Sequence, residues 1–313
     1  MKFSASVIVP TRGGIDRLPR LVDSLAKQSR TDFETIFVVD GDTDGSTQYL
    51  KSGSVRGLLP NSGVITFDEN RGRSEALNAG HERATGEVLI RCDDDLAPRT
   101  DYIESHIARQ NSGPQGTIGL YKNVFPGTPY ATAYGIDADL NFTRTALNTS
   151  SDMRWRYWAG NVSIPREIWN EVGPYDTNFR TYGWEDVDYG YRIRAAGYPV
   201  IIAPELTTPH HVAAVTTKIR VMRALHSGAA RETFVAAHGP EALPVSSATG
   251  LWNSLVSGLS KISTERTLDV AAGAVDGILP RIPKKIGTKL VALLVESAGT
   301  AGINYPARAK SNF

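Results

Sequence analysis

Between residues 4 and 119, short apolar runs alternate regularly with helix-like stretches. Each apolar run is rich in β-branched residues and predicts a buried strand. Helical spacing of apolar residues predicts helices over 18–27 and 74–84. Strands that alternate with helices pair in parallel and carry helices on both faces of the sheet, so we predict an α/β fold. The four predicted strands cover residues 6–9, 35–39, 64–67 and 88–90.

Polar residues follow three of these runs where each run ends. Thr11 follows the first, Asp40 the second, and the triplet Asp93-Asp94-Asp95 the fourth. In open parallel sheets, ligands bind outside the carboxyl ends of the strands. Three adjacent carboxylates repel one another, and a divalent cation such as Mg²⁺ or Mn²⁺ removes that conflict. A solvated turn that caps the next helix explains the triplet equally well when it is considered alone.

Two further groups suit a phosphorylated nucleotide. Asp40 can accept a hydrogen bond from an imide N–H such as that of uracil, although an Asx-turn is the more common role in a loop rich in Gly and Asp. Residues 70–78 open a helix that carries Arg71 and Arg73. The guanidinium group of arginine and the N-terminus of a helix both bind phosphate. A capped surface helix is the alternative interpretation.

An acidic helix start at Trp184-Glu185-Asp186 supplies a candidate general base. A positioned carboxylate can deprotonate a sugar hydroxyl that attacks an anomeric carbon, and the apolar Trp184 would raise its pKa. Acidic residues in a first helical turn are also ordinary partners of the helix macrodipole. A further apolar run at 200–202 predicts a last strand. His210 and His211 follow it, and one of them is a candidate metal ligand.

The section between residues 120 and 152 has little periodicity, and we expect strand and loop there. Just beyond it, Trp155 and Trp158 alternate with arginines. These rings suit stacking on sugars or packing in a core, and the sequence favours neither role.

From residue 216 onward the chain is rich in Ala, Gly, Ser and Leu, which predicts a helical region. We expect one helix over 216–238 and two or three more, interrupted by Pro280 and Pro283. The basic residues of segment 280–285 allow peripheral contact with a membrane surface, and a solvated helix face explains them as well. Small residues also permit close helix packing, including packing between copies of the chain.

Composition excludes several classes. The net charge of +1 provides no field for nucleic acid. The single cysteine, Cys92, excludes an intrachain disulfide and a cysteine-rich zinc site, which favours a reducing compartment. No uncharged apolar run approaches the roughly 20 residues of a membrane span, and no secretory signal opens the sequence. We expect a cytoplasmic protein, at most peripheral at the inner face of the membrane.

Six motifs in order resemble family 2 of the glycosyltransferases, which have the GT-A fold. The resemblance covers residues 4–211, some two-thirds of the chain. One of the motifs, the nucleoside loop, has Asp42 where serine is more usual. The motifs are the opening strand 6–11, the nucleoside loop 39–46, the helix start 70–78, the triplet 93–95, the acceptor-side segments 159–161 and 173–176, and the Glu-Asp motif 185–188 with its following helix.

The resemblance implies a Rossmann-like, mostly parallel mixed sheet flanked by helices, with a C-terminal helical extension. The catalytic domain would be residues 1–215, with a nucleotide-sugar half at 1–119 and an acceptor half at 120–215. The helical region would be residues 216–313. The implied reaction is a single inverting displacement that moves a sugar from a nucleotide-diphosphate donor, a UDP-sugar, to a saccharide or glycolipid in cell-surface polysaccharide or glycoconjugate synthesis.

The resemblance also implies a role for each matching residue. Asp186 would be the catalytic base, and Glu185 would help to hold the acceptor. Asp95 would bind Mn²⁺ or Mg²⁺ with Asp93 and His210, since the family pattern fits His210 better than His211. The implied donor-binding residues are Pro10, Thr11, Arg12, Asp40, Arg71, Arg73, Asp93 and Asp94, and the implied acceptor residues are Trp155, Trp158, Gly160, Asn161 and Trp184.

Two rival classes stay open on the sequence. A nucleotidyltransferase also combines strand-end carboxylates, a metal and a nucleotide on an α/β sheet. It normally has a glycine-rich basic loop after the first strand, and residues 10–14 are only a faint version of one. A non-catalytic carbohydrate-binding protein would need neither the triplet nor the Glu-Asp motif.

Overall fold

The computed structural model describes residues 3–179, 183–211, 214–244 and 250–310. The chain forms two compact units. The second unit includes residues 125–142, which the predicted domain boundary assigned to the acceptor half; Tyr130 and Ala133 pack in that unit's core. The boundary at residue 215 stays a prediction. The first unit comprises residues 1–124, 143–180 and 185–212, and the second comprises 125–142, 181–184 and 213–313.

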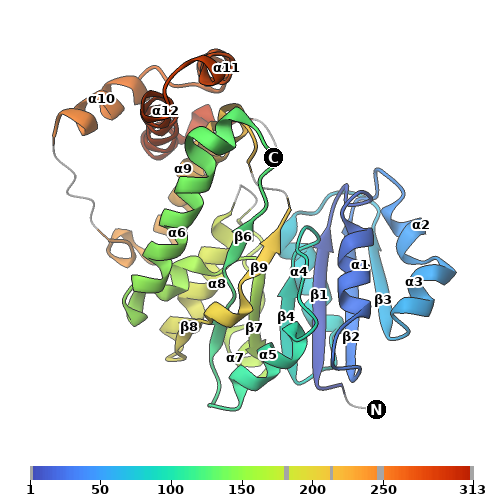
Figure 1. Ribbon diagram of the computed structural model, residues 1–313. Coiled ribbons are helices and arrows are strands. Elements are labelled where there is room, and N and C mark those ends of the chain that lie inside the picture. The colour runs from blue at the N-terminus through green and yellow to red at the C-terminus, as the bar shows by residue number, and fades with distance from the viewer. Residues whose placement is uncertain (1–2, 180–182, 212–213, 245–249, 311–313) are drawn as a thin grey trace. The chain divides into compact units, whose positions relative to one another are not determined.

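The first unit is built on a seven-stranded sheet with the order β3-β2-β1-β4-β7-β5-β8 (Figure 1). The first four strands of that order pair in parallel, whereas β7 runs antiparallel to both of its neighbours. This mixed, mostly parallel sheet confirms the predicted fold class. A second sheet pairs β6 with β9 in parallel. The strands are β1 (Ala5–Thr11), β2 (Phe33–Asp40), β3 (Ser62–Phe67), β4 (Val88–Cys92), β5 (Gly116–Ile118), β6 (Tyr121–Asn123), β7 (Asn161–Pro165), β8 (Val200–Ile202) and β9 (Thr208–His210).

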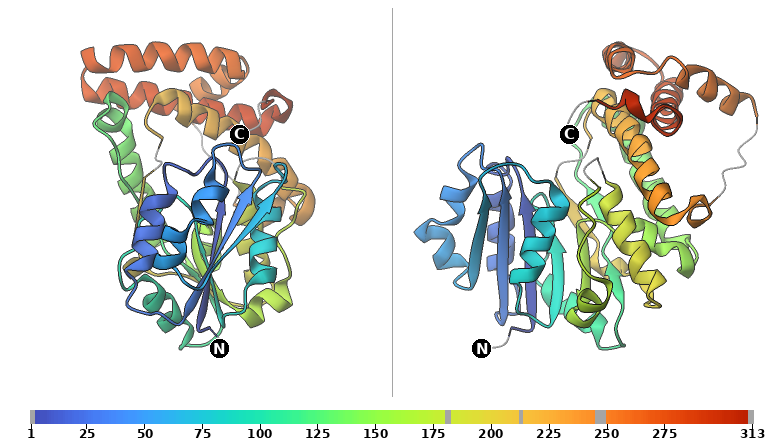
Figure 2. Two further views of the ribbon diagram at one scale, coloured as in Figure 1. Left: turned by 90° about the vertical axis from the view of Figure 1, so that its right-hand side faces the viewer. Right: turned by 180° about the vertical axis from the view of Figure 1, so that it is seen from behind.

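Helices cover both faces of this sheet (Figure 2). Val7 and Val9 belong to a core that α1 and α5 also line. Ile8 points to the other face, where Gly80 lets α4 approach. In β4 the residues Val88, Ile90 and Cys92 belong to the first core, so alternation places Arg91 on the opposite face. The helices are α1 (Leu18–Ala26), α2 (Ser46–Leu50), α3 (Gly53–Leu58), α4 (Arg73–Arg83), α5 (Tyr102–Gln110), α7 (Arg166–Val172) and α8 (Trp184–Ala195).

The section expected to be strand and loop is largely helical, and that prediction is wrong. A short π-helical segment, η1 (Ala131–Gly135), continues into α6 (Ile136–Asn148). Most apolar residues of α6 are exposed, including Leu140 and Phe142, and Ala146 is its buried residue. Without an apolar stripe facing a core, the sequence shows no clear helical period.

The second unit is helical, as the composition predicts. The longest helices, α9 (Thr217–His238) and α12 (Lys284–Asn304), pack closely where Gly228 meets Gly302. A Cβ atom at Gly302 would lie 2.1 Å from the Leu225 carbonyl oxygen, so the contact requires glycine. Two further helices are α10 (Leu251–Ser260) and α11 (Glu265–Ile278), and short 3-10 segments elsewhere are η2 (Ser151–Tyr157), η3 (Pro204–Leu206), η4 (Pro240–Ala242) and η5 (Leu279–Arg281).

By length and composition alone, α12 is apolar enough to cross a membrane, the one such helix in the described ranges. The sequence expectation did not anticipate it, because Lys289 and Glu296 interrupt the apolar residues. Val291, Ala298 and Ala301 are buried in the core of the second unit. One face of α12 therefore packs in that core, and 39% of its most apolar window is buried.

The last described residues also have regular structure. Pro306–Arg308 form a 3-10 turn, η6, and the Arg308 guanidinium donates to the carbonyls of Ser260 and Ser263 at 3.0 Å each. Residues 311–313 lie outside the described ranges.

Candidate active site

The parallel strands β1, β2 and β4 bring Thr11, Asp40 and the acidic triplet to one edge of the sheet. Asp94 is buried there. It accepts hydrogen bonds from Thr11 Oγ1 at 2.5 Å and from Arg17 Nε and Nη2 at 2.9 and 2.8 Å. Burial raises the pKa of Asp94 above its ordinary value, although the Arg17 hydrogen bonds oppose that shift. Asp94 therefore fastens β4 to β1 and to the start of α1.

Asp40 joins the end of β2 to the loop before α4. Its two carboxylate oxygens accept the backbone N–H groups of Arg71 at 2.6 Å and Gly72 at 3.0 Å. Asp40 thus bonds a distant loop and does not form the local Asx-turn that the sequence allows. The Arg71 guanidinium lies over the Phe67 ring, 4.7 Å from its centroid. This arrangement fixes the loop that carries Arg71 and leads into Arg73, the first residue of α4.

Arg91 is the centre of a buried charge cluster, and its side chain is 1% exposed. Its guanidinium donates to Asp93 Oδ1 at 2.9 Å through Nε and to Asp93 Oδ2 at 3.3 Å through Nη2. Its Nη1 donates to Asp186 Oδ1 on α8. One buried cation therefore links the acidic triplet to the predicted base.

The two carboxylates on Arg91 titrate differently. Burial acts to raise the pKa of Asp93, but the charges of Arg91 and Arg73 outweigh it, so the net pKa is lowered. Burial raises the pKa of Asp186 to about 7, with Glu185 adding to the shift and Arg91 opposing it. A carboxylate with a pKa near neutrality suits general-base catalysis.

Helix α4 also contacts the Glu-Asp motif, residues 185–188, through its first residue, Arg73. Arg73 Nη1 lies 3.3 Å from Glu185 Oε1, with the arginine half exposed and the glutamate buried. Trp184, the residue before Glu185, belongs to the second unit. Its indole donates to the Ser227 carbonyl there, and its ring packs 5.2 Å from that of Phe234.

His210 faces Asp95, because the segment around β9 pairs with the residues that follow the triplet. His211 N–H donates to the Asp95 carbonyl at 2.9 Å, and Ala97 N–H donates to the Pro209 carbonyl at 3.0 Å. The His210 Nε2 atom then lies 3.1 Å from Asp95 Oδ2. Its Nδ1 lies 2.6 Å from Asn123 Oδ1, and its ring stacks on Tyr121.

The donor set of Asp95 and His210 fits a divalent cation. An amide oxygen on Nδ1 fixes the proton there and leaves the Nε2 lone pair facing the carboxylate. Two ligands on neighbouring positions of an octahedral ion lie about 3 Å apart, given bonds of about 2.1 Å. The other oxygen, Asp95 Oδ1, is buried without a hydrogen-bond partner among the described residues. Asp93, by contrast, is already held by Arg91.

Within the described ranges, no group of three or more His, Cys, Asp or Glu side chains is arranged to hold a metal. Two protein ligands agree with an ion that takes its remaining ligands from substrate phosphates and water.

The predicted acceptor aromatics are core residues in this structure. Trp155 is 2% exposed and Trp158 is 3% exposed, and the Trp158 indole donates to the Tyr175 hydroxyl at 3.2 Å. Stacking on a sugar requires an open ring face, so we assign both rings to the core of the first unit rather than to the predicted acceptor site.

Asn161 and Gly160 also have structural roles. Asn161 is fully buried, donates to the Leu206 carbonyl at 2.9 Å and accepts from the Tyr102 hydroxyl at 3.0 Å. Gly160 lies against Asp93: a Cβ atom there would be 2.0 Å from Asp93 Cγ. Both residues support the triplet, and neither presents a polar side chain to a saccharide.

Two predicted donor residues lie at the end of β1. Pro10 is half-buried and Arg12 is exposed, with the Arg12 carbonyl accepting from Arg17 Nη2 at 3.2 Å. Sequence reasoning missed Arg17 and Arg91. A charged residue inside an apolar strand signals a buried partner, and that signal was present at Arg91.

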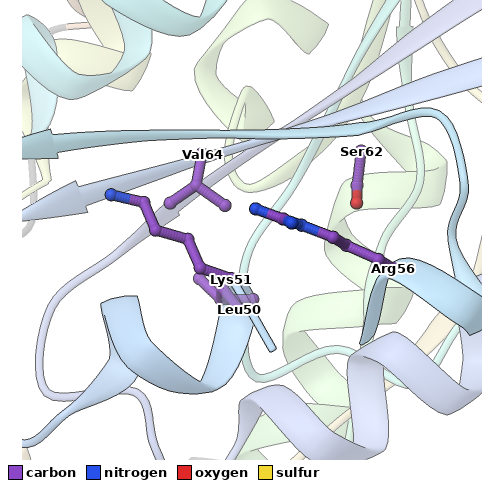
Figure 3. A pocket seen from close by; sticks show the side chains of 5 residues that line it. All are labelled: Leu50, Lys51, Arg56, Ser62 and Val64. Atoms are coloured by element: carbon purple, nitrogen blue, oxygen red, sulfur yellow. The ribbon is translucent and has the colours of Figure 1, made fainter. Parts of the chain in front are cut away.

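A separate hollow lies at the edge of the sheet beyond β2. It has a volume of about 140 Å³ and is lined by residues of α2, α3 and β3 (Figure 3). None of the predicted site residues lines it. The lining residues are Leu50, Lys51, Arg56, Ser62 and Val64.

Comparison with known proteins identifies the class. A family model described as Glycosyl transferase family 2 matches residues 6–170, just over half of the chain. The mixed, mostly parallel sheet agrees with the GT-A fold of the solved structures that this chain resembles. The chain belongs to glycosyltransferase family 2.

Curated relatives agree with this assignment. A validoxylamine A glucosyltransferase of Streptomyces hygroscopicus subsp. jinggangensis (strain 5008) is 26% identical over 238 residues, which cover 66% of this chain and 55% of the relative. An undecaprenyl-phosphate 4-deoxy-4-formamido-L-arabinose transferase of Pseudomonas fluorescens (strain Pf0-1) is 32% identical over 111 residues, 34% of this chain and 32% of the relative. The chain spans about half the length, or less, of these relatives.

Solved structures show the same fold. The mannosyltransferase PcManGT of Pyrobaculum calidifontis, in complex with GDP-Man and Mn²⁺, aligns with a TM-score of 0.62 at 19% identity, covering 98% of this chain and 88% of that one. TarS 1–349 of S. aureus in complex with UDP aligns with a TM-score of 0.53 at 18% identity, covering 96% and 92%. The GT-A fold of this chain is thereby confirmed.

Proposed function

We propose that this chain is a metal-dependent, inverting glycosyltransferase that moves a sugar from a nucleotide-diphosphate donor, a UDP-sugar, to a saccharide or glycolipid acceptor. The observation that carries the proposal is the arrangement around the acidic triplet. On one side Asp95 faces His210 with a buried oxygen that no described residue bonds, and on the other Asp93 is linked through Arg91 to Asp186.

In this proposal the donor lies across the carboxyl edge of the sheet. Asp40 contacts the base through lone pairs that its two backbone bonds leave open. Pro10, Thr11 and Arg12 line the nucleoside site, and Arg71 and Arg73 face the diphosphate. Asp94 acts as a positioning residue, because its oxygens already accept from Thr11 and Arg17.

The metal site consists of Asp95 and His210, with the diphosphate oxygens and water as the remaining ligands. A bound Mn²⁺ or Mg²⁺ supplies neutralisation of the charge that develops on the departing diphosphate. Asp93 contributes its charge through Arg91 rather than by direct ligation.

Asp186 is the proposed general base. It accepts the proton of the acceptor hydroxyl as that oxygen forms a bond to the anomeric carbon, and the bond from that carbon to the diphosphate breaks. Arg91 holds the Asp186 carboxylate, and Glu185, held by Arg73, takes part in binding the acceptor. Alignment and charge stabilisation supply most of the rate, and the base adds about 10²–10⁴-fold.

The setting of this reaction is proposed as cell-surface polysaccharide or glycoconjugate synthesis in the cytoplasm, at the inner face of the membrane. Relatives whose names specify an undecaprenyl-phosphate substrate support a lipid-linked acceptor. The titles of the solved neighbours name UDP and GDP-Man, so experiment must decide the base.

The first test is a thermal-shift screen of UDP- and GDP-sugars with and without Mn²⁺. We expect one donor to raise the melting temperature only with the metal, because its diphosphate completes the coordination of the ion. Asp95→Ala should lose this metal-dependent shift, whereas the control Asp101→Ala, which removes an exposed carboxylate paired with Arg99, should keep it. An Asp95→Ala protein with an unchanged shift would show that the triplet is structural.

The second test separates binding from chemistry. Asp186→Asn should bind the donor nearly as well as the native protein and lose about 100-fold or more of the transfer rate. An active Asp186→Asn enzyme would exclude this base. Product analysis decides between reaction classes, since nucleoside diphosphate marks glycosyl transfer and pyrophosphate marks a nucleotidyltransferase.

A further inference from the structure

Helix α11 of the second unit has an outward face that the core does not use. Leu268 and Ala272 are buried on one side. On the other side, Arg266, Val270, Ala274 and Ile278 are exposed, with Val270 68% exposed. Residues spaced by four and eight positions share one face of a helix. This outward face is apolar over most of its length of about 21 Å, given 14 residues and a rise of 1.5 Å for each.

The apolar surface continues into the neighbouring segments. Leu251 and Leu255 are exposed on one face of α10, and Ile262 is 65% exposed in the turn between α10 and α11. Ile286, in the first turn of α12, is 51% exposed. In Figure 2, α11 lies beside α12, and packing contacts join the two helices. Exposed apolar residues thus flank α11 at both of its ends.

Most of the exposed charges around α11 are basic. All residues from 250 to 290 are described, and the three acidic residues among them, Glu265, Asp269 and Asp276, are half-buried, although the Asp269 side chain is 43% exposed. Basic residues are exposed at both ends of α11. They are Lys261 and Arg266 near its start, and Arg281, Lys284, Lys285 and Lys289 beyond its end.

The acidic residues of this segment are held by the second unit itself. Asp276 accepts the backbone N–H of Thr217 at 2.9 Å, Asp269 pairs with Lys218 at 2.5 Å, and Glu265 pairs with His226 at 3.0 Å. These contacts pair the acidic residues of the segment within the second unit. Among the bases, Lys284 pairs with Asp137 at 2.8 Å, which leaves the other five as the basic part of this surface.

We propose that α11 and the residues at its two ends form a docking surface for a membrane that contains anionic lipids. Apolar residues enter the boundary between head groups and acyl chains, and the flanking bases bind the lipid phosphates. A helix with a weakly apolar face needs this second, electrostatic signal for stable attachment. The helix lies in the plane of the surface and does not span the bilayer.

The charge of this surface favours a membrane over a second copy of the chain as its binding partner. A two-fold interface places the same patch on both sides, so the five bases other than Lys284 would face the same five of the other copy. That arrangement is repulsive, because these bases outnumber the three acidic residues of the segment, each of which already has a partner in the second unit. An anionic bilayer supplies the opposite charge.

The test is co-sedimentation of the full chain with vesicles of phosphatidylcholine alone and of phosphatidylcholine with phosphatidylglycerol. We expect binding to the anionic vesicles, little binding to the neutral ones, and release as the salt concentration rises. Arg266→Glu with Lys285→Glu should weaken the partition at least about tenfold. The matched control, Lys51→Glu with Arg56→Glu, makes the same charge change on exposed residues of the first unit and should bind like the native chain.

A second pair of variants tests the apolar part. Ile262→Ser with Val270→Ser should weaken the partition at least about fivefold, whereas Leu58→Ser, at a 52% exposed leucine of the first unit, should not. Equal pelleting of the Arg266→Glu, Lys285→Glu protein and its control would overturn the proposal. So would the absence of binding to anionic vesicles, or a dimer in solution that Val270→Ser dissociates.

Membrane docking does not depend on glycosyl transfer, and the two are measured separately. Each variant is also assayed for its melting temperature and for metal-dependent nucleotide-sugar binding, which we expect to be unchanged because the predicted donor site lies in the first unit. Vesicle binding by a chain that binds no nucleotide-sugar would leave the docking surface intact and refute the proposed function alone.

Discussion

The two units of the chain place their charged residues in opposite ways. In the first unit, charges are buried in the sheet, where Arg91 joins Asp93 to Asp186. In the second unit, the tightest helix contact is made by Gly228 and Gly302, and the bases around α11 face outward. Buried charge couples stability to chemistry, whereas close packing of small residues affects stability alone. The difference predicts which substitutions disturb catalysis and which disturb only the fold.

The largest effect is expected at the buried cation. Arg91→Met leaves the buried Asp186 and the partly buried Asp93 without their partner, which should lower the free energy of unfolding by about 3–5 kcal/mol and abolish transfer. Thermal and urea unfolding measure the first loss, and release of nucleoside diphosphate measures the second. Arg99→Met is the control, because it breaks an exposed ion pair worth at most about 1 kcal/mol. Equal free energies of unfolding for Arg91→Met and Arg99→Met would show that the contacts of Arg91 with Asp93 and Asp186 do not stabilise the fold.

A smaller effect is expected where α9 meets α12. Gly302→Ala places a Cβ atom against backbone atoms of α9, 2.1 Å from the Leu225 carbonyl oxygen, and should lower the unfolding free energy by about 1–3 kcal/mol. Gly258→Ala in α10 meets open space and should gain up to about 1 kcal/mol from helix propensity. Donor binding by the folded fraction should be the same in both. A loss of donor affinity in Gly302→Ala alone would contradict the expectation that helix packing in the second unit affects only stability.

The buried Asp186 of the first unit should also make the transfer rate depend on pH. Burial raises the pKa of Asp186 to about 7, and the base must be ionised to act. We therefore expect kcat/KM to fall about tenfold for each pH unit below 7. A profile without a break between pH 6 and 8 would contradict this assignment.

The same group also links pH to stability. Because the pKa of Asp186 in the folded state lies above its unfolded value, the native protein should lose stability as the pH rises toward 7. Asp186→Asn carries no such proton and should gain stability relative to the native protein between pH 5 and 8. Melting temperatures over that interval measure the difference.

The smallest effect is expected at a helix cap. Thr264→Ala removes the side chain that accepts the Thr267 N–H at 3.2 Å at the start of α11, and should cost about 1 kcal/mol. Its counterpart in the first unit, Ser52→Ala at the start of α3, removes a longer bond of 3.4 Å and should cost less. Unfolding by urea compares the two, and a larger loss for Ser52→Ala would contradict the expectation.

The sequence predicted the parts of the fold that have a local cause. Buried parallel strands are apolar runs, so β1 to β4 and the acidic residues at their ends stand out along the chain. The resemblance paired His210 with Asp95, and the structure brings these side chains together across 115 positions. The roles of the predicted site residues in catalysis stay predictions.

The parts that the sequence did not predict depend on distant partners. Arg17 binds Asp94 across 77 positions and Arg91 binds Asp186 across 95, and no local pattern encodes either contact. Helix α6 was missed for a different reason, since its apolar residues are exposed and give no stripe. Trp155 and Trp158 were ambiguous because an aromatic cluster has the same composition in a core as in a sugar-binding site.

Gly160 has a consequence for how this sequence can vary. Its N–H donates to the Tyr121 hydroxyl at 2.7 Å, its carbonyl accepts from Asp93 N–H at 2.9 Å, and a methyl group there would overlap the Asp93 carboxylate. Alanine, the smallest replacement, already displaces the acidic residue that Arg91 holds. In a library that samples all amino acids at each position, selection for transfer activity should leave glycine alone at position 160, while neighbouring surface positions tolerate many residues.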